Sequence, residues 1–153
     1  MMQTFNNRRT VEAAVIGSTI LFDGQEAAEF AAGELTGAEF SFPDMRAQFR
    51  VVCDLTAAGR PIDVITFSEE LAKRGEFQEA AVHEVLNVVP HAAHIRLYVE
   101  QLQALHRRDE LRRCSERMNV RAENLGCDPF DIIDEALNEL ETLRAGNVRK
   151  SDL

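Results

Sequence analysis

The chain has 153 residues, 45% hydrophobic and 28% charged, with 26 Asp and Glu against 17 Lys and Arg. This length is typical of one domain and supports a hydrophobic core without disulfides or metal ions, so disordered and collagen-like classes are excluded. A net charge of −9 excludes a domain whose main task is to neutralise nucleic-acid phosphates. Little direct binding to duplex DNA is therefore expected, although a local basic stripe is compatible with this composition.

The three cysteines, Cys53, Cys114 and Cys127, are an odd number at wide spacing, which indicates neither a disulfide framework nor a metal-binding or redox pair. A reducing, cytoplasmic compartment fits this pattern best. The first residues lack the order of a secretory signal, and no apolar run approaches the ~20 residues that cross a bilayer. We therefore expect a cytoplasmic protein without membrane contact.

Apolar residues recur at helical spacing over residues 11–22, which predicts a first helix. Thr10 is placed to cap its free amides, and Glu12 to complement its dipole. Asp23 and Glu26 have the spacing of a capping box, which predicts that a second, short helix begins there.

Further helices are predicted between residues 43 and 89. Pro43 occupies a first-turn position and Gly59 is a natural left-handed stop, so a third helix lies between them. Asp63 can cap a fourth helix that Gly75 stops, and Pro90 ends a fifth. The apolar positions expected to face the core of this globule are Met45, Phe49, Val52, Leu55, Val64, Phe67, Leu71, Val82, Val85, Leu86 and Val89.

Residues 92–124 contain no Pro or Gly and repeat apolar positions at helical spacing, which predicts one long helix. Gly126 ends it, and Asp128 followed by Pro129 begins another. The apolar residues of this last helix step by three and four positions, as in a coiled-coil seam; they are Phe130, Ile133, Leu137 and Leu140. The last two helices are expected to fold back on each other as an antiparallel hairpin.

The expected fold class is therefore all-α. It consists of a small orthogonal helical globule over residues 1–92 and an antiparallel helical hairpin over residues 93–144. Residues 145–153 lose the helical period and are expected to form a linker or tail.

No motif of a catalytic or cofactor site occurs in the chain. The phosphate-binding pattern GxxxxGK[ST], the dinucleotide pattern GxGxxG, the nucleophile elbow GxSxG and the zinc motif HExxH are all missing. Acidic pairs such as Glu69 and Glu70 lie on polar helix faces, as solvated surfaces do. His91 and His94 lie one turn apart, but no third metal ligand accompanies them in sequence. We expect no catalytic residue, cofactor or metal, and neither ATP hydrolysis nor DNA unwinding by this chain.

Arg113, Arg117 and Arg121 recur every fourth residue along the predicted long helix. Glutamates are interspersed with them. Two interpretations stay open: a mixed, salt-laced face, or a stripe that contacts an acidic partner.

Three blocks of this sequence resemble the N-terminal domain of DnaB-type replicative DNA helicases. They are residues 11–17 (VEAAVIG), residues 59–71 (GRPIDVITFSEEL) and residues 89–95 (VPHAAHI), with Tyr98 three further on. The middle block, in which Gly-x-Pro-Ile-Asp precedes a helix, is the most specific. The resemblance covers nearly the whole chain.

The chain departs from the family pattern in two places. His91 and His94 stand where the family more often has Ser and Asn, and the usual proline before the first helix is missing around Arg8 and Arg9. Neither departure concerns a catalytic group, because the family's ATP-hydrolysing P-loop domain has no counterpart in this sequence. Residues 146–150 resemble the start of the linker to that domain, so a helicase fragment cut at its domain boundary is expected.

The resemblance implies a non-catalytic assembly and docking domain in DNA replication. In the family, N-terminal domains pair through their hairpins and form a trimer-of-dimers collar on a hexameric ring. This collar helps to recruit primase, and helicase loaders also make use of this layer of N-terminal domains. The implied partners are a second copy of the chain, primase and a loader. The alternative is a free-standing adaptor of mobile-element origin, a loader or inhibitor, that binds a host helicase. The hairpin residues expected to be buried between copies are Leu111, Met118, Ile133, Leu137 and Leu140.

Overall fold

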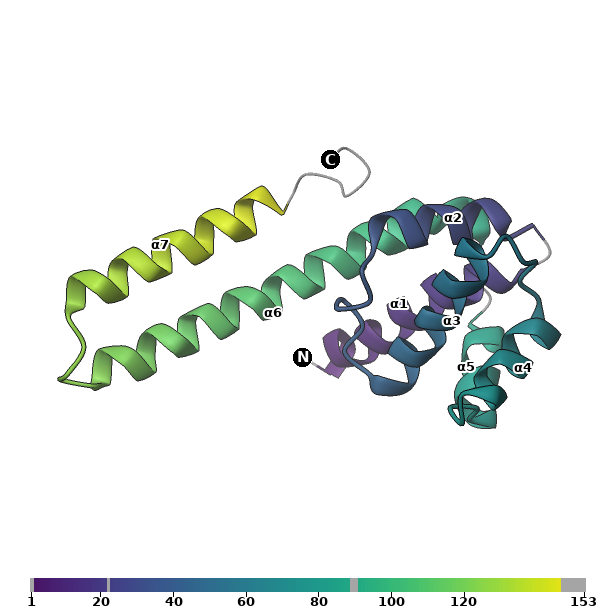
Figure 1. Cartoon of the computed structure of the whole chain (residues 1–153), viewed down its shortest axis with the longest axis horizontal. Coiled ribbons are helices and arrows are strands. Elements are labelled where there is room, and N and C mark those ends of the chain that lie inside the picture. Colours follow the sequence, from purple (N-terminus) through teal and green to yellow (C-terminus); the bar gives the residue numbers. More distant parts are fainter. Residues whose placement is uncertain (1, 22, 89–90, 147–153) are drawn as a thin grey trace. The chain divides into compact units, whose positions relative to one another are not determined.

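The structure, a computed structural model, describes residues 2–21, 23–88 and 91–146. Over these residues it contains helices and no strand, which confirms the all-α fold class (Figure 1). The expectations for Val89, for Pro90 and for the tail beyond Gly146 lie outside the described residues. A 3-10 turn, Ala92–His94, precedes α6. The α-helices are α1 (Met2–Ile20), α2 (Gln25–Glu34), α3 (Pro43–Ala57), α4 (Val64–Lys73), α5 (Glu79–Asn87), α6 (Ile95–Glu123) and α7 (Pro129–Ala145).

Helix α1 lies at the centre of the globule. Every residue from Glu12 to Ile20 is buried, so this part of the helix is enclosed on all sides instead of having a single apolar face. Small residues such as Ala13 let α2, α3 and α5 pack against it. The predicted start was wrong, because the helix begins at Met2 and Thr10 lies inside it. Residues 2–9 include no Pro or Gly and continue the helix.

The start of α2 differs from the predicted capping box. Gly24 is the N-cap and makes no side-chain cap hydrogen bond, while Asp23 lies in the preceding turn. The chain turns so tightly here that a Cβ at position 24 would lie 2.5 Å from the carbonyl oxygen of Ser18. The Gly24 amide donates to the carbonyl of Leu21 at 2.8 Å. Close approach of α1 and α2, and not a side-chain cap, thus decides where α2 begins.

Helices α3 and α4 begin and end where the sequence predicts. Pro43 lies in the first turn of α3, and Gly59 and Gly75 follow α3 and α4 with φ angles of 68° and 69°. Asp63 accepts a hydrogen bond of 2.8 Å from the amide of Thr66, whose hydroxyl accepts one of 3.0 Å from the Asp63 amide. The two residues therefore form a complete capping box.

The core of the globule contains most of the residues expected there. The rings of Phe40 and Phe49 stack with centroids 4.6 Å apart. Val64 and Leu86 were wrongly placed in the core, being 44% and 36% exposed, because the first turn of α4 and the outer side of α5 extend beyond the packed region. The predicted core residues that are buried are Met45, Phe49, Val52, Leu55, Phe67, Leu71, Val82 and Val85.

Helix α6 contributes to two compact units, residues 1–103 and residues 104–153. Its first turns carry Ile95, Val99 and Leu102, which are buried in the core of the first unit. The globule therefore extends beyond residue 92, where the sequence suggested its end, because these apolar side chains on α6 complete its core.

Arg9 joins three helices of the first unit. Its guanidinium pairs with Asp44 on α3 and with Glu84 on α5, each at 2.7 Å, and lies 4.8 Å from the centre of the Phe42 ring. Hydrogen bonds from Arg9 lower the pKa of Asp44 below its ordinary value.

Candidate docking surface

The second unit is a helical hairpin whose turn is fixed by local hydrogen bonds. The side chain of Asn124 accepts from the amide of Gly126 at 2.9 Å. Asp128 caps α7 by accepting from the amide of Phe130 at 2.8 Å, with Pro129 in the first turn, as the sequence predicts.

Helix α7 runs back along α6, which confirms the antiparallel hairpin (Figure 1). Arg117 of α6 pairs with Glu139 of α7 at 2.8 Å, whereas Arg121, one turn further along α6, pairs with Glu135. Residues later in α6 thus contact residues earlier in α7. Cys114 lies between the two helices and is 1% exposed.

The predicted interface residues of the hairpin are exposed in the single chain. On α7, Ile133, Leu137 and Leu140 share one face at helical spacing, whereas Ala136, on the side facing α6, is buried. We call the five predicted residues the hairpin seam; they are Leu111 (44% exposed), Met118 (36%), Ile133 (52%), Leu137 (56%) and Leu140 (40%). All five side chains are exposed in the single chain, and their burial between copies stays a prediction.

Three further large apolar side chains of the hairpin are exposed: Val120, Leu125 and Phe130. Val120 was missed by the sequence analysis, because it lies outside the repeat that defines the buried face of the long helix. Phe130 belongs to the coiled-coil repeat predicted for the last helix, together with Ile133 and Leu137, and it is exposed as they are.

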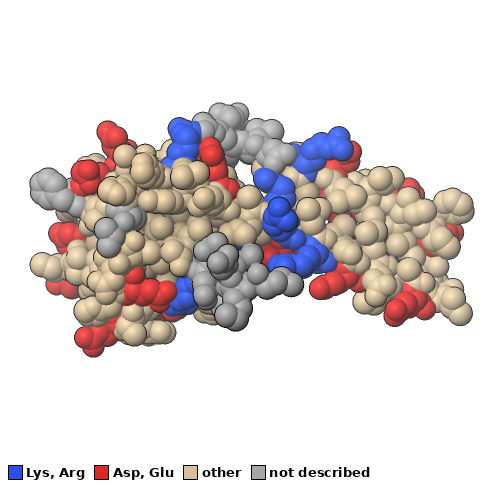
Figure 2. All heavy atoms as spheres, turned by 180° about the vertical axis from the view of Figure 1, so that it is seen from behind, with Lys and Arg blue, Asp and Glu red and all other residues tan. Residues whose placement is uncertain are grey.

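Each arginine of the predicted stripe has a carboxylate partner within the hairpin. The pairs are Arg113–Glu110, Arg117–Glu139 and Arg121–Glu135. Hydrogen bonds to these carboxylates raise the pKa of Arg117 and Arg121, and the bond from Arg117 lowers the pKa of Glu139. These ion pairs are what the first interpretation, a mixed face of salt-bridged charges, requires. Contact of the stripe with an acidic partner stays a prediction. Acidic side chains are also scattered over the face drawn in Figure 2.

Cys114 packs against the same ion pairs. The pKa of the Cys114 thiol is raised, mainly by its hydrogen bond to the carboxylate of Glu139 and to a smaller extent by burial. A raised pKa and a buried position are typical of a packing cysteine and not of a nucleophile.

The two histidines considered as metal ligands form an aromatic cluster instead. The rings of His91 and His94 lie 5.4 Å apart between centroids, and His94 contacts Tyr98 edge-on at 6.3 Å. The amide of His91 donates to the Tyr98 hydroxyl at 3.3 Å. In the part of the chain that the structure describes, no group of three or more His, Cys, Asp or Glu side chains could hold a metal ion.

Within the described ranges, no helix combines the length and apolar character needed to span a membrane.

Known proteins are similar to this chain in sequence and in fold. The Replicative DNA helicase DnaB of Rhodothermus marinus is 30% identical over 152 residues, an alignment that covers 92% of this chain and 15% of that protein. The chain therefore spans a small part of the length of this relative. The crystal structure of the N-terminal domain of DnaB helicase from Mycobacterium tuberculosis superposes with a TM-score of 0.75 at 22% identity, covering 87% of this chain and 95% of that one. This likeness shows the helical fold.

The family model described as the DnaB-like helicase N terminal domain matches residues 4–104. The match coincides closely with the first compact unit, residues 1–103, and contains the GRPIDVITF block with its capping box. The chain belongs to the family of DnaB-like helicase N-terminal domains.

Proposed function

We propose that this chain is the non-catalytic assembly and partner-docking domain of a cytoplasmic DnaB-type replicative helicase. In this proposal copies pair through their hairpins, build the collar of a hexameric ring and present docking surfaces to primase and to a helicase loader. Membership of the helicase family supports the replication context. The observation that carries the proposal is the exposed hairpin seam.

A second hairpin is the simplest cover for this seam. Burial of apolar surface lowers the free energy by roughly 25 cal/mol for each Å² removed from water. An exposed row of large apolar side chains therefore favours association. Leu111 and Met118 lie two turns apart on α6, and Ile133, Leu137 and Leu140 follow one face of α7. Two such hairpins can pack symmetrically, each burying the same row of residues.

The charges beside the seam favour this arrangement. Arg117 and Arg121 are neutralised by Glu139 and Glu135 of the same hairpin. If a second copy covers the seam, these two guanidinium groups stay paired, so their burial does not oppose assembly as that of unpaired charges would.

The experiment places a carboxylate in the seam with the Leu137→Asp and Leu140→Asp variants. Sedimentation velocity should show the wild-type chain as a dimer or larger oligomer and both variants shifted toward the monomer. Far-UV circular dichroism should show unchanged helix content, because the seam is exposed in the single chain. Asn138→Asp adds the same charge at a neighbouring exposed polar position and should leave assembly intact.

The core variant Phe67→Ala should behave in the opposite way. Phe67 is fully buried, so truncation should cost ~3–5 kcal/mol of unfolding free energy through lost burial and a cavity, without touching the seam. A strictly monomeric wild type at high concentration, or seam variants that assemble normally, would overturn the pairing model.

A further inference from the structure

A cavity of about 290 Å³ lies in the globule, on a surface that shares no residue with the hairpin seam. It opens between α2 and the segment after α3. A cavity of this size has room for several water molecules or for one long side chain. Its lining residues are Thr19, Leu21, Gln25, Ala28, Glu29, Thr56, Gly59, Arg60, Pro61 and Ile62.

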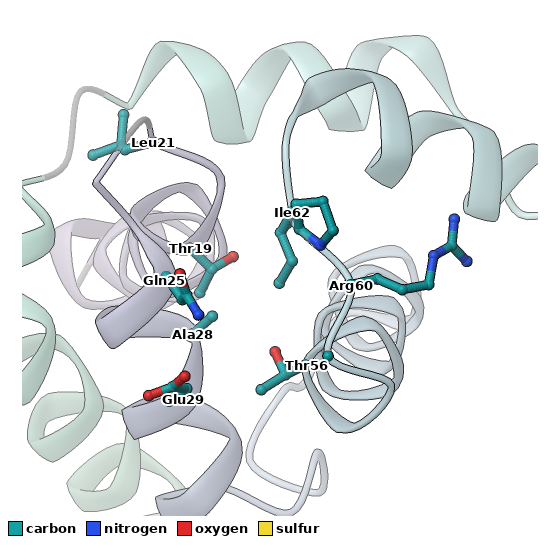
Figure 3. Close-up of a pocket in the computed structure, with 10 residues that line it drawn as sticks. Thr19, Leu21, Gln25, Ala28, Glu29, Thr56, Arg60 and Ile62 are labelled. Atoms are coloured by element: carbon teal, nitrogen blue, oxygen red, sulfur yellow. The ribbon is translucent and has the colours of Figure 1, made fainter.

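The hydroxyls of this cavity can only accept hydrogen bonds from a ligand. Thr19 uses its one hydroxyl proton to donate to the carbonyl of Ile16 at 2.6 Å, and Thr56 uses its own to donate to the carbonyl of Val52 at 2.7 Å. Each oxygen keeps lone pairs. Thr19 is 1% exposed and forms part of the buried wall, so Thr56, which is half-buried, is the more accessible acceptor. Figure 3 shows the side chains of Thr19 and Thr56 directed toward the space between the two segments.

The remaining polar groups also favour a donor. The carboxylate of Glu29 has no hydrogen-bond or ion-pair partner among the described residues. Gln25 can present its amide oxygen, because its NH₂ and carbonyl can exchange places. Arg60 lines the cavity with its stem, but its guanidinium extends away from it, toward Glu70 at 3.9 Å.

Two helix C-termini add negative potential to the cavity. Thr19 and Leu21 lie at the end of α1, and Thr56 and Gly59 lie at the end of α3. Neither helix has a basic residue in its last turn to neutralise the negative end of its dipole. The opposing N-terminus of α2 carries Glu26 in its first turn, which complements that helix within the chain. The cavity therefore favours a positively charged ligand.

We propose that the cavity is a docking pocket for an arginine side chain of a partner protein. The guanidinium has N–H donors spread around a plane, which matches acceptors placed on several walls. Leu21 and Ile62, which are half-buried, provide apolar surface for its aliphatic stem. The net charge of −9 favours approach of a basic partner over long distances. The pocket goes beyond the proposed function, because it assigns a recognised chemistry to a surface outside the hairpin.

The test uses the complete 153-residue chain labelled with nitrogen-15, and N-acetyl-arginine methylamide as the probe. Saturable shifts in the millimolar range are expected at the amides of Thr19, Gln25, Thr56 and Gly59. The norleucine probe, which has an apolar stem without the guanidinium, should produce none of them.

Two charge variants then distinguish a cation pocket from an anion pocket. Glu29→Gln should weaken arginine binding by about threefold to fivefold, the range of an exposed ion pair. Glu69→Gln makes the same charge change at an exposed position of α4 and should have no effect. Arg60→Met removes a like charge from the rim and should preserve or strengthen binding.

The proposal is overturned if no saturable shift occurs, if the norleucine or a glutamate probe binds equally well, or if a lysine probe binds more tightly than arginine. Equal losses from Glu29→Gln and Glu69→Gln would also overturn it, since they would show a general charge effect. Each of these results would leave hairpin pairing untouched, because sedimentation measures that property separately.

Discussion

The hydroxyl of Ser41 donates a hydrogen bond of 2.7 Å to the carboxylate of Glu12, a side chain with no exposed surface. The same carboxylate also accepts from the amide of Ser41 at 3.1 Å and from the guanidinium of Arg8 at 3.1 Å. A buried carboxylate is tolerated only when its oxygens are paired in this way. Glu12 therefore fastens the segment before α3 to the central helix.

Replacing Glu12 by Ala should strongly destabilise the globule. The variant leaves the guanidinium of Arg8 and the amide of Ser41 without this acceptor, so we expect a loss of about 3–5 kcal/mol in unfolding free energy. Ser41→Ala removes one hydrogen bond and should cost about 1 kcal/mol. Urea unfolding followed by circular dichroism measures both values, and equal costs would refute the central role of Glu12.

The Arg9–Asp44 pair should contribute a stability that disappears in acid. The native pKa of Asp44 lies below its ordinary value of 3.8, so on acidification the unfolded chain takes up the proton first. The contribution is complete above the ordinary value and is lost as the pH falls through the native one. Asp44→Asn should therefore be less stable than the wild type by about 1.5–3 kcal/mol near neutral pH, with a gap that closes in acid. Urea midpoints across this pH range provide the measurement, and a gap independent of pH would contradict the assignment.

Two glycines of the α2 region should respond to alanine in opposite directions. In Gly24→Ala the new Cβ would meet the Ser18 carbonyl at 2.5 Å, so the backbone must shift, at a cost of about 1–3 kcal/mol. Gly33 lies inside α2 with nothing within 4 Å of the equivalent position, so Gly33→Ala should stabilise by up to about 1 kcal/mol. Thermal unfolding of the matched pair decides whether the tight turn at Gly24 is correctly described.

The reactivity of Cys114 should depend on Glu139. Because the hydrogen bond to Glu139 raises the pKa of the thiol, Glu139→Gln should lower that pKa and shift the pH profile of alkylation toward lower pH. Glu141→Gln removes the same charge from an exposed position and serves as the control. Mass spectrometry of the peptide that contains Cys114, after timed exposure to iodoacetamide, follows the rate. An unchanged profile in Glu139→Gln would show that burial alone sets the pKa.

The sequence by itself determined most helix ends and the hairpin. Pro43, Gly59, Asp63 and Gly75 act through their own backbone geometry or through a hydrogen bond to a residue three positions away, so their effect is readable locally. The hairpin follows from the same kind of local signal, a helix stop and a capped restart around residue 126. The capping box predicted at Asp23 failed because a contact between two helices decided that turn instead.

Only the tertiary structure decided which polar groups are buried and what they face. Glu12 has the spacing of a first-turn dipole partner, yet its hydrogen-bond partner Ser41 lies 29 residues away, and no local pattern encodes that contact. The cavity between α2 and the segment after α3 is a second example. Thr19 and Thr56 both line it, and the hydroxyl of each donates a hydrogen bond to a carbonyl of its own helix. Periodicity shows which residues share a helix face, but the packing of one helix against another determines whether that face meets water, a carboxylate or a cavity.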